Sequence, residues 1–418
     1  MKSIKAKKIK TINTKTLIVA LDIGKNIHHG YFRAPNGKEI GPFPFYNNSH
    51  SFKSFWEKLS KFKENQMLDE VVIGFESTGP YAEPICHYLR KKPVKLVQVN
   101  PMHTKRVKEL TGNSPNKTDK KDPRIIADVI SLGHSLTVIV PEGAAAHLRR
   151  LTQARERAIE RRTAMSNQLQ HLVFLIFPEL VRIIKPSTKT GMHLIKHYSD
   201  PKKLLFAGIN KLNAIIKKVS RGRLGTDRAE QLHSAAKASV GITEGKESIL
   251  FEITHLVSKI ESENLYVEDL EKQMGNYLEK IPYSHSILSI NGIGRVTAAG
   301  LIGEVGDFRK FNTISEVLKL AGLDLYEISS GAHQGCRRIS KRGRALMRKL
   351  LYFAAINTTR KNGILHGPYQ RHLAKGMPRI KALMAIARKL IGIIFALVRD
   401  HSNYIADYSS QLVFKKAA

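Results

Sequence analysis

The chain has 418 residues, of which 42% are hydrophobic and 25% are charged, proportions that are ordinary for a folded protein. Its 69 Lys and Arg against 35 Asp and Glu give a formal net charge of +34, an excess that attracts polyanions such as nucleic acids. Cys86 and Cys336 lie far apart, which argues against a disulfide framework and against a cysteine-based zinc site. The length predicts two or three domains, and no segment is long and apolar enough to predict a membrane span, so no membrane partner is expected.

The front of the chain has the pattern of an α/β domain. Residues 1–15 are rich in Lys and predict a flexible basic arm. Between residues 16 and 142, short apolar runs alternate with helical stretches; the runs are LIVALDIG (17–24), VVIGFEST (71–78), VKLVQVNP (94–101) and LTVIVP (136–141). HHGYFRA (28–34) follows a turn and predicts a strand that pairs with the first in a hairpin. Runs this apolar are typical of central strands covered on both faces.

Residues 143–283 predict a helical, coiled-coil region. Apolar residues recur at roughly heptad spacing from 144 to 177, and Pro178 ends that helix. Residues 183–243 predict short helices. From 244 to 281 apolar residues alternate in steps of three and four, broken only by Glu263, which predicts a coiled-coil helix. Its partner is either the helix over 144–177, in an intramolecular hairpin, or a second copy of the chain, in a dimerisation stalk.

Residues 284–418 predict a third, compact and basic helical domain. NGIGRVTAAG (291–300) predicts a turn followed by a helix. The amides around Gly292 and Gly294 suit a phosphate, as in helix-hairpin-helix DNA-binding proteins. A tight helix–helix turn without a ligand explains the same glycines equally well.

Acidic residues stand at two predicted strand ends and in one downstream pair. Asp22 and Glu76 end apolar strands and are followed closely by glycine, and Asp119 and Asp122 lie in NKTDKKDPRIIADV. Carboxylates that converge at strand ends are the ligands that Mg²⁺ or Mn²⁺ prefers, and such ions assist phosphodiester chemistry. A single Asp at a strand end is more often a cap or turn residue. Asp122 before Pro123 also suits a helix N-cap, so a purely structural role stays open there.

Several phrases in a fixed order resemble one known family. VALDIGK, the Glu of GFESTGPY, VNP followed by KTDKKDP, and the block SINGIGRVTAAGLIGEVGDFRKF, LAGL, SSG and RRISKRGRALMRKLL are similar to the DEDD transposases of the insertion-sequence one-ten family. The resemblance covers nearly the whole length. Pro123 departs from it, because a small helix former is expected after the second Asp of the pair.

The resemblance implies a ribonuclease-H/RuvC-like mixed sheet at the front, with Asp22, Glu76, Asp119 and Asp122 as ligands of Mg²⁺ or Mn²⁺. It also implies a back domain that contributes a serine nucleophile, which by motif is Ser330, with Ser329 as the alternative. The family works as a recombinase guided by a structured noncoding bridge RNA that pairs with donor and target DNA. A bacterial, cytoplasmic and nucleoid-associated protein is therefore expected. An active site built from separate domains further suggests a homo-oligomer, a dimer or a tetramer.

The serine motif lies in a basic stretch, EISSGAHQGCRRISKRGR. A serine hydroxyl needs help before it attacks phosphorus. Cationic side chains that follow it would offset the developing charge; they are Arg337, Arg338, Lys341, Arg342 and Arg344. The same arginines would also suit a solvated helix face, and a Ser-Ser-Gly sequence on its own is usually only a turn.

Three functions account for these features to different extents. A transposase or site-specific recombinase explains both the carboxylates and the serine. A RuvC-like metal-dependent nuclease, such as a junction resolvase that uses water, needs only the carboxylates. A non-catalytic nucleic-acid-binding protein explains the charge alone.

Overall fold

The computed structural model describes residues 12–76, 79–111, 122–138, 141–327, 335 and 337–406. The chain divides into two compact units, Met1–Ile139 and Val140–Ala418, each of which is described by itself. Within the described residues, no helix is both long and apolar enough to cross a membrane.

Within the described part of the first unit, six strands form one mixed sheet in the order β3-β2-β1-β4-β5-β6. The strands are β1 (Thr16–Ile23), β2 (Ile27–Arg33), β3 (Glu39–Tyr46), β4 (Glu70–Glu76), β5 (Lys95–Val99) and β6 (Ser135–Thr137). β2 pairs antiparallel with both β1 and β3, whereas β4 pairs parallel with β1 and β5, and β6 returns antiparallel to β5. The hairpin predicted for residues 17–34 is confirmed, and the sheet is consistent with the expected ribonuclease-H-like domain.

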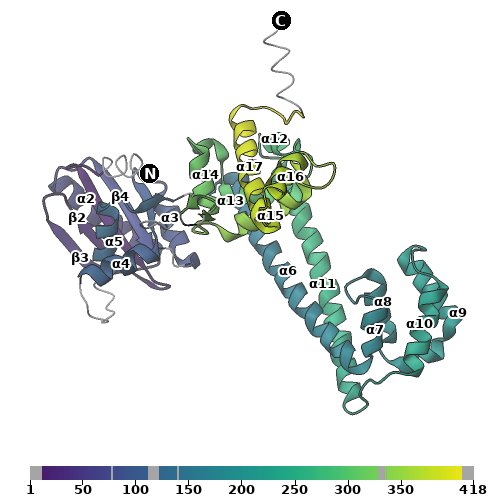
Figure 1. Ribbon diagram of the computed structural model, residues 1–418. Helices are drawn as coiled ribbons and strands as arrows, with labels where there is room; N and C mark the ends of the chain where they lie inside the picture. The colour runs from purple at the N-terminus through teal and green to yellow at the C-terminus, as the bar shows by residue number, and fades with distance from the viewer. Residues whose placement is uncertain are drawn as a thin grey trace, which may run out of the picture. The chain divides into compact units, whose positions relative to one another are not determined.

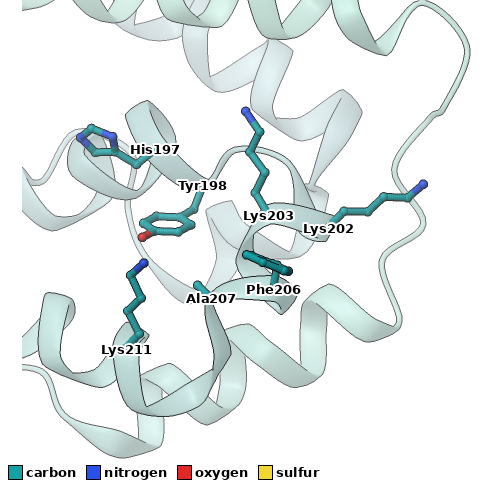
Figure 2. A pocket seen from close by; sticks show the side chains of 7 residues that line it. All are labelled: His197, Tyr198, Lys202, Lys203, Phe206, Ala207 and Lys211. Carbon is teal, nitrogen blue, oxygen red and sulfur yellow. The ribbon is translucent and has the colours of Figure 1, made fainter.

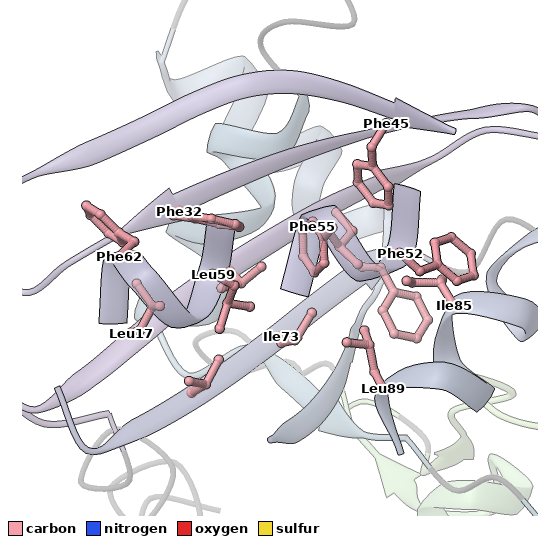
Figure 3. Packing of buried hydrophobic residues seen from close by; sticks show 14 of the residues in the cluster. Leu17, Phe32, Phe45, Phe52, Phe55, Leu59, Phe62, Ile73, Ile85 and Leu89 are labelled. Carbon is pink, nitrogen blue, oxygen red and sulfur yellow. The ribbon is translucent and has the colours of Figure 1, made fainter. Parts of the chain in front are cut away.

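Helices cover both faces of this sheet, which explains why its central strands are apolar throughout. The helices of the unit are α2 (Ser49–Asn65), α3 (Glu83–Leu89), α4 (Pro101–Thr111) and α5 (Asp122–Ser131), with a 3-10 turn at Gly79–Ala82. On one face, apolar residues of α2 and α3 pack on alternate strand residues, as Figure 3 shows for Phe55, Leu59 and Ile85. On the other face, α5 packs on the intervening strand residues.

Strand β3 was not predicted from the sequence. Pro42 and Pro44 interrupt its pattern, and proline cannot donate a hydrogen bond to a neighbouring strand. β3 lies at the edge of the described sheet, where β2 is its one neighbour among the described strands, so prolines are tolerated there.

Two long helices of the second unit, α6 (Gly143–Ile176) and α11 (Lys246–Leu278), form an antiparallel hairpin (Figure 1). Arg155 forms a hydrogen bond with Glu271, and Arg161 forms one with Glu263. Residue numbers therefore increase along α6 where they decrease along α11, so the two helices run antiparallel. Glu263, the residue that breaks the apolar seam, accepts two hydrogen bonds from Arg161, at 2.8 and 3.0 Å. The intramolecular alternative is therefore the arrangement that this chain adopts.

Short helices connect the two arms of this hairpin, as predicted for residues 183–243. They are α7 (Pro178–Ile183), α8 (Lys189–Tyr198), α9 (Pro201–Ser220) and α10 (Thr226–Lys237). Their apolar residues share one core with the adjoining ends of α6 and α11. Figure 1 shows these helices gathered at one end of the hairpin.

The remaining helices of the second unit gather at the opposite end of the hairpin (Figure 1). They are α12 (Ser284–Leu288), α13 (Arg295–Val305), α14 (Ile314–Ala321), α15 (Ala345–Thr358), α16 (His366–Ala374) and α17 (Arg379–Arg399), with a 3-10 turn at Phe308–Lys310. The strands β7 (Leu325–Tyr326) and β8 (Arg338–Ile339) pair antiparallel between α14 and α15. Helix α13 crosses α6 closely: a Cβ atom added to Gly303 would lie 2.7 Å from the backbone nitrogen of Arg149.

Candidate functional site

Asp22 and Glu76 end neighbouring parallel strands at the same level. The last paired positions of β1 and β4 are Leu21 and Phe75, and each carboxylate residue follows directly. Because neighbouring strands lie about 4.8 Å apart, the two residues are adjacent across the sheet. Both are half-buried. We call Asp22 and Glu76 the strand-end pair.

The strand-end pair faces the α4 and α5 side of the sheet. Leu21 and Phe75 belong to the core on the opposite face, and successive side chains of a strand alternate between faces. Two residues earlier on each strand, Ala20 and Gly74 lie on the face that α5 covers, where Ile130 would collide with any side chain at Gly74. The pair therefore lies on the face from which α5 can contribute a ligand.

Asp122 begins α5, and the direction of this helix places it toward the strand-end pair. Arg124 lies over the ring of Tyr31, 5.8 Å from its centre, and Asp128 accepts a hydrogen bond from Arg33 at 2.5 Å. Along β2, Tyr31 is closer than Arg33 to the end of the sheet that holds the pair. Helix α5 therefore starts near that end and runs back across the sheet. Three of the four predicted carboxylates thus lie toward the same end of one sheet face.

Two residues of α4 contact these carboxylates and were missed by the sequence reasoning. The buried hydroxyl of Thr104 donates a hydrogen bond to Oε1 of Glu76. The ammonium group of Lys108 lies 2.8 Å from Oδ1 of Asp122. The sequence marks these two residues only indirectly. They lie on the helix that follows β5, and β5 is the neighbour of β4, the strand that bears Glu76.

The donor chemistry of these residues fits a hard divalent cation. The strand-end pair and Asp122 offer carboxylate oxygens only, which suit Mg²⁺ or Mn²⁺ better than a soft metal. Within the described ranges, no group of three or more Asp, Glu, His or Cys residues is close enough to hold an ion as it stands. Asp119, the fourth predicted ligand, lies outside the described residues.

The predicted serines lie on the connection between β7 and β8. Residues 328–334, which include Ser329 and Ser330, are outside the described residues. The two strands that lead into and out of this segment are fixed by the pairs Leu325–Ile339 and Tyr326–Arg338. The hydroxyl of Ser340 also bonds Asp324 at the base of the hairpin.

Most of the predicted phosphate-binding cations surround this hairpin on the surface. Arg337, Arg338, Lys341 and Arg342 are exposed, and Arg337 forms an ion pair with Glu327 across the hairpin at 3.1 Å. Arg344 differs, because its guanidinium group is half-buried and donates to the backbone carbonyl of Glu304. Burial lowers the pKa of Arg344 to about 10. Arg344 thus contacts the protein interior, and its predicted role as a phosphate ligand stays a prediction.

The glycines of the NGIGR motif form the turn between α12 and α13. Gly292 has a φ of 102°, and a Cβ atom there would lie 3.0 Å from the side chain of Thr358. Gly294 is the N-cap of α13 and has open space around it. The turn itself therefore requires a glycine at 292. A phosphate site at the N-terminus of α13, beside Gly294, stays a prediction.

Comparison with known proteins identifies relatives of this chain. Residues 19–178 match the family model of the DEDD transposases of the IS110 type, described as "Transposase", and residues 284–370 match the model described as "Transposase IS116/IS110/IS902 family". The chain is 25% identical to the 43.6 kDa protein of insertion element IS110 from Streptomyces coelicolor, over 93% of this chain and 95% of that protein.

Other relatives are similar over shorter stretches. A 42 kDa protein of insertion element IS900 from Mycobacterium paratuberculosis is 24% identical over 69% of this chain and 73% of its own length. The transposase for insertion sequence element IS1111A from Coxiella burnetii is 28% identical over 40% of this chain and 46% of its own length. Since both ends of the chain match in the expected order, this protein belongs to the IS110 family of DEDD transposases, the insertion-sequence one-ten family.

Proposed function

We propose that this transposase recombines DNA by attack of Ser330 on a DNA phosphodiester, assisted by Mg²⁺ or Mn²⁺ held by Asp22, Glu76, Asp119 and Asp122. The observation that carries the metal site is the adjacency of Asp22 and Glu76 on parallel strands, with Asp122 at the start of the helix above the same face. Membership of the family supports the choice of a serine as the nucleophile.

A divalent cation at these carboxylates would withdraw charge from the phosphate and so make its phosphorus easier to attack. Ser330 Oγ loses its proton and forms a bond to phosphorus, while the bond from phosphorus to the 3′ oxygen breaks. The 3′ oxygen gains a proton and leaves as a free hydroxyl. Exposed cations of β8 and the residues that follow it, such as Arg338 and Lys341, would offset the charge that builds up on the phosphate oxygens.

The covalent phosphoserine keeps the energy of the broken bond. A 3′ hydroxyl of another strand can therefore attack the same phosphorus, release the serine and complete strand exchange without an external energy source. Hydrolysis by water would lose that energy, which is why a recombinase benefits from a protein nucleophile.

The test is a denaturing gel of the full chain incubated with end-labelled DNA and Mg²⁺. The proposal predicts a protein–DNA adduct that Ser330→Ala abolishes and that the matched neighbour Ser329→Ala keeps. Asp22→Ala and Glu76→Ala should abolish the adduct while leaving DNA binding intact. Cleavage that survives Ser330→Ala would instead support a RuvC-like nuclease or junction resolvase, and binding without cleavage under any metal would support a non-catalytic binding protein.

Guidance by a structured bridge RNA, which the family resemblance implies, is part of the proposal, and the net charge of +34 agrees with a second polyanion beside DNA. We also propose a homo-oligomer, a dimer or tetramer, and three functional segments after the basic arm: residues 16–142, 143–283 and 284–418. RNA that co-purifies with the chain and confers choice of target DNA would support the guidance. Recombination that is unaffected by ribonuclease and by added transcripts would remove it.

A further inference from the structure

The helices at one end of the α6–α11 hairpin carry a concentration of positive charge that the proposed chemistry does not use. Residues 178–238 contain thirteen Lys and Arg against four Asp and Glu. Part of the acidic charge is already neutralised, because Asp200 pairs with Lys246 at 2.7 Å. This segment, which we call the tip, spans α7 to α10 and belongs wholly to the second unit.

A surface pocket of about 500 Å³ lies in the tip, between the end of α8 and the first turns of α9. Its lining combines cations and aromatic rings; the residues are His197, Tyr198, Lys202, Lys203, Phe206, Ala207 and Lys211. Figure 2 shows the Tyr198 ring near the middle of this group, with Lys211 on one side and Phe206 and Lys203 on the other. Among the residues that the structure describes, no carboxylate lines the pocket.

The three lysines of the pocket are available for an anionic ligand. Lys202, Lys203 and Lys211 are exposed, and none forms an ion pair with a carboxylate among the described residues. Lys196, just outside the pocket, is by contrast paired with Glu261 at 2.8 Å. Like charges held close together without partners repel one another, so a phosphate would stabilise this arrangement.

Phe206 is 96% exposed, the highest value among the large apolar side chains of the described residues. A ring left in water at the mouth of a basic pocket contributes nothing to the core of the tip. The neighbouring Tyr198 is half-buried and packs partly against that core. One ring is thus anchored while the other is free to receive a planar group, which is the arrangement of a stacking platform.

A break in helix α9 gives the pocket its shape. Gly208 has φ 71° and ψ 162°, so the helix is interrupted between Phe206 and Lys211. The left-handed φ favours glycine over any other residue. In a continuous helix Lys211 would lie beside Ala207, whereas the break sets Phe206 and the lysines of the first turns at an angle to Lys211.

We propose that this pocket binds unpaired nucleotides of a nucleic acid, with a base stacked on Phe206 and the adjoining phosphates held by Lys202, Lys203 and Lys211. A paired base in a duplex has both faces covered by its neighbours, so the ring selects a single-stranded segment. The shared chemistry is a phosphodiester with an unstacked base, which RNA loops and single-stranded DNA both offer. This inference concerns a site apart from the serine and carboxylate chemistry, so it stands or falls independently of that chemistry.

The experiment measures binding of fluorescent oligonucleotides of equal length to the full chain by anisotropy: single-stranded RNA, single-stranded DNA and blunt duplex DNA. Phe206→Ala should weaken single-strand binding by about 5- to 150-fold, the loss expected for one stacking platform. Phe206→Trp should keep it. The triple change of Lys202, Lys203 and Lys211 to Gln should lower the slope of log affinity against log salt by about 2, since each phosphate contact contributes about 0.7.

Lys217→Gln with Lys218→Gln is the matched control, because these exposed lysines lie on the same helix but outside the pocket. In this control variant, Phe206→Ala should weaken single-strand binding by the same factor as in the unaltered chain. Photo-crosslinking with a thiouracil-bearing strand should label the peptide that contains Phe206. A loss confined to RNA or to DNA identifies the source of the strand. Equal loss for the duplex, no loss with Phe206→Ala, or preferential binding of the tip to anionic lipid vesicles would overturn the proposal. The Ser330 adduct assay reads out the catalytic proposal separately.

Discussion

Thr104 hydrogen bonds the carboxylate of Glu76, so a residue of α4 fixes the side chain at the end of β4. The same hydroxyl lies 2.9 Å from the carbonyl of Pro101 in the first turn of that helix. Since the Thr104 side chain is buried, its rotamer is set by packing as well as by these contacts. Glu76 is thereby held in one orientation before any ligand arrives.

We expect Thr104→Val to lower Mn²⁺ affinity and DNA cleavage by about 10- to 100-fold, the loss typical of a residue that orients a metal ligand. Valine keeps the shape of threonine but cannot donate a hydrogen bond. Thr104→Ser keeps the donor and should retain most of the affinity. Calorimetric titration with Mn²⁺ checks this without relying on activity, and equal affinities for the valine variant and the wild type would refute the positioning role.

Asp122→Asn separates a metal ligand from a helix cap. Asparagine caps a helix about as well as aspartate but lacks its charge. The proposed role predicts that the melting temperature falls by at most about 4 °C, since the lost ion pair with Lys108 contributes about 1 kcal/mol or less, while cleavage falls by about 10- to 100-fold. If cleavage is unchanged and only Asp122→Ala lowers the melting temperature, Asp122 serves the helix alone.

The sequence predicted those parts of the fold in which one pattern dominates. β1 and β4 are buried on both faces, and α6 and α11 bury a long apolar seam, so their periodicity was visible. Predicted boundaries still erred, since the strand expected over 94–101 covers Lys95–Val99 and that over 136–141 covers Ser135–Thr137. The edge strand β3 was not predicted from the sequence, because Pro42 and Pro44 are not expected in a central strand.

The candidate site was predictable only where a residue type marks chemistry. A carboxylate at a strand end stands out, but Thr104 is an ordinary residue in a helix, and its contact with Glu76 depends on how α4 packs on the sheet. Similarly, the sequence around Glu263 does not indicate that Arg161, 102 positions away, donates hydrogen bonds to its carboxylate. Such partners arise from tertiary packing, which local patterns do not encode.

Gly303→Ala should destabilise the second unit by about 1–3 kcal/mol, the usual cost of overpacking. An added Cβ would meet backbone atoms of Leu148 and Arg149 at 2.7–2.9 Å, and backbone cannot move aside as a side chain can. Gly392→Ala is the matched control: this glycine also lies within a helix, but no atom of the described part of the chain lies within 4 Å of the added Cβ. It should raise stability by about 0.5–1 kcal/mol through helix propensity. Urea unfolding of both variants checks the pair, and equal shifts would contradict the close crossing.

His28 should make the first unit less stable in acid. Its ring is fully buried between Phe45 and Phe52, and burial lowers its pKa below the ordinary 6.5, an effect that the Asn47 side chain partly offsets. Below about pH 6.5 the unfolded chain therefore binds a proton that the folded chain does not, so this contribution is complete above pH 6.5 and is lost as the pH falls toward the folded pKa. His28→Phe should flatten the fall in melting temperature between pH 7 and pH 5. An unchanged fall would show that other groups cause it.

Mass spectrometry of the trapped protein–DNA complex tests the central claim most directly. After nuclease digestion, trypsin releases residues 320–337 as one peptide, whose serines are Ser329 and Ser330. The account predicts a nucleotide phosphate on Ser330, formed only with Mg²⁺ or Mn²⁺ and absent from Asp22→Ala. A nucleotide on another residue, or complete cleavage of DNA with this peptide unmodified throughout the reaction, would contradict it.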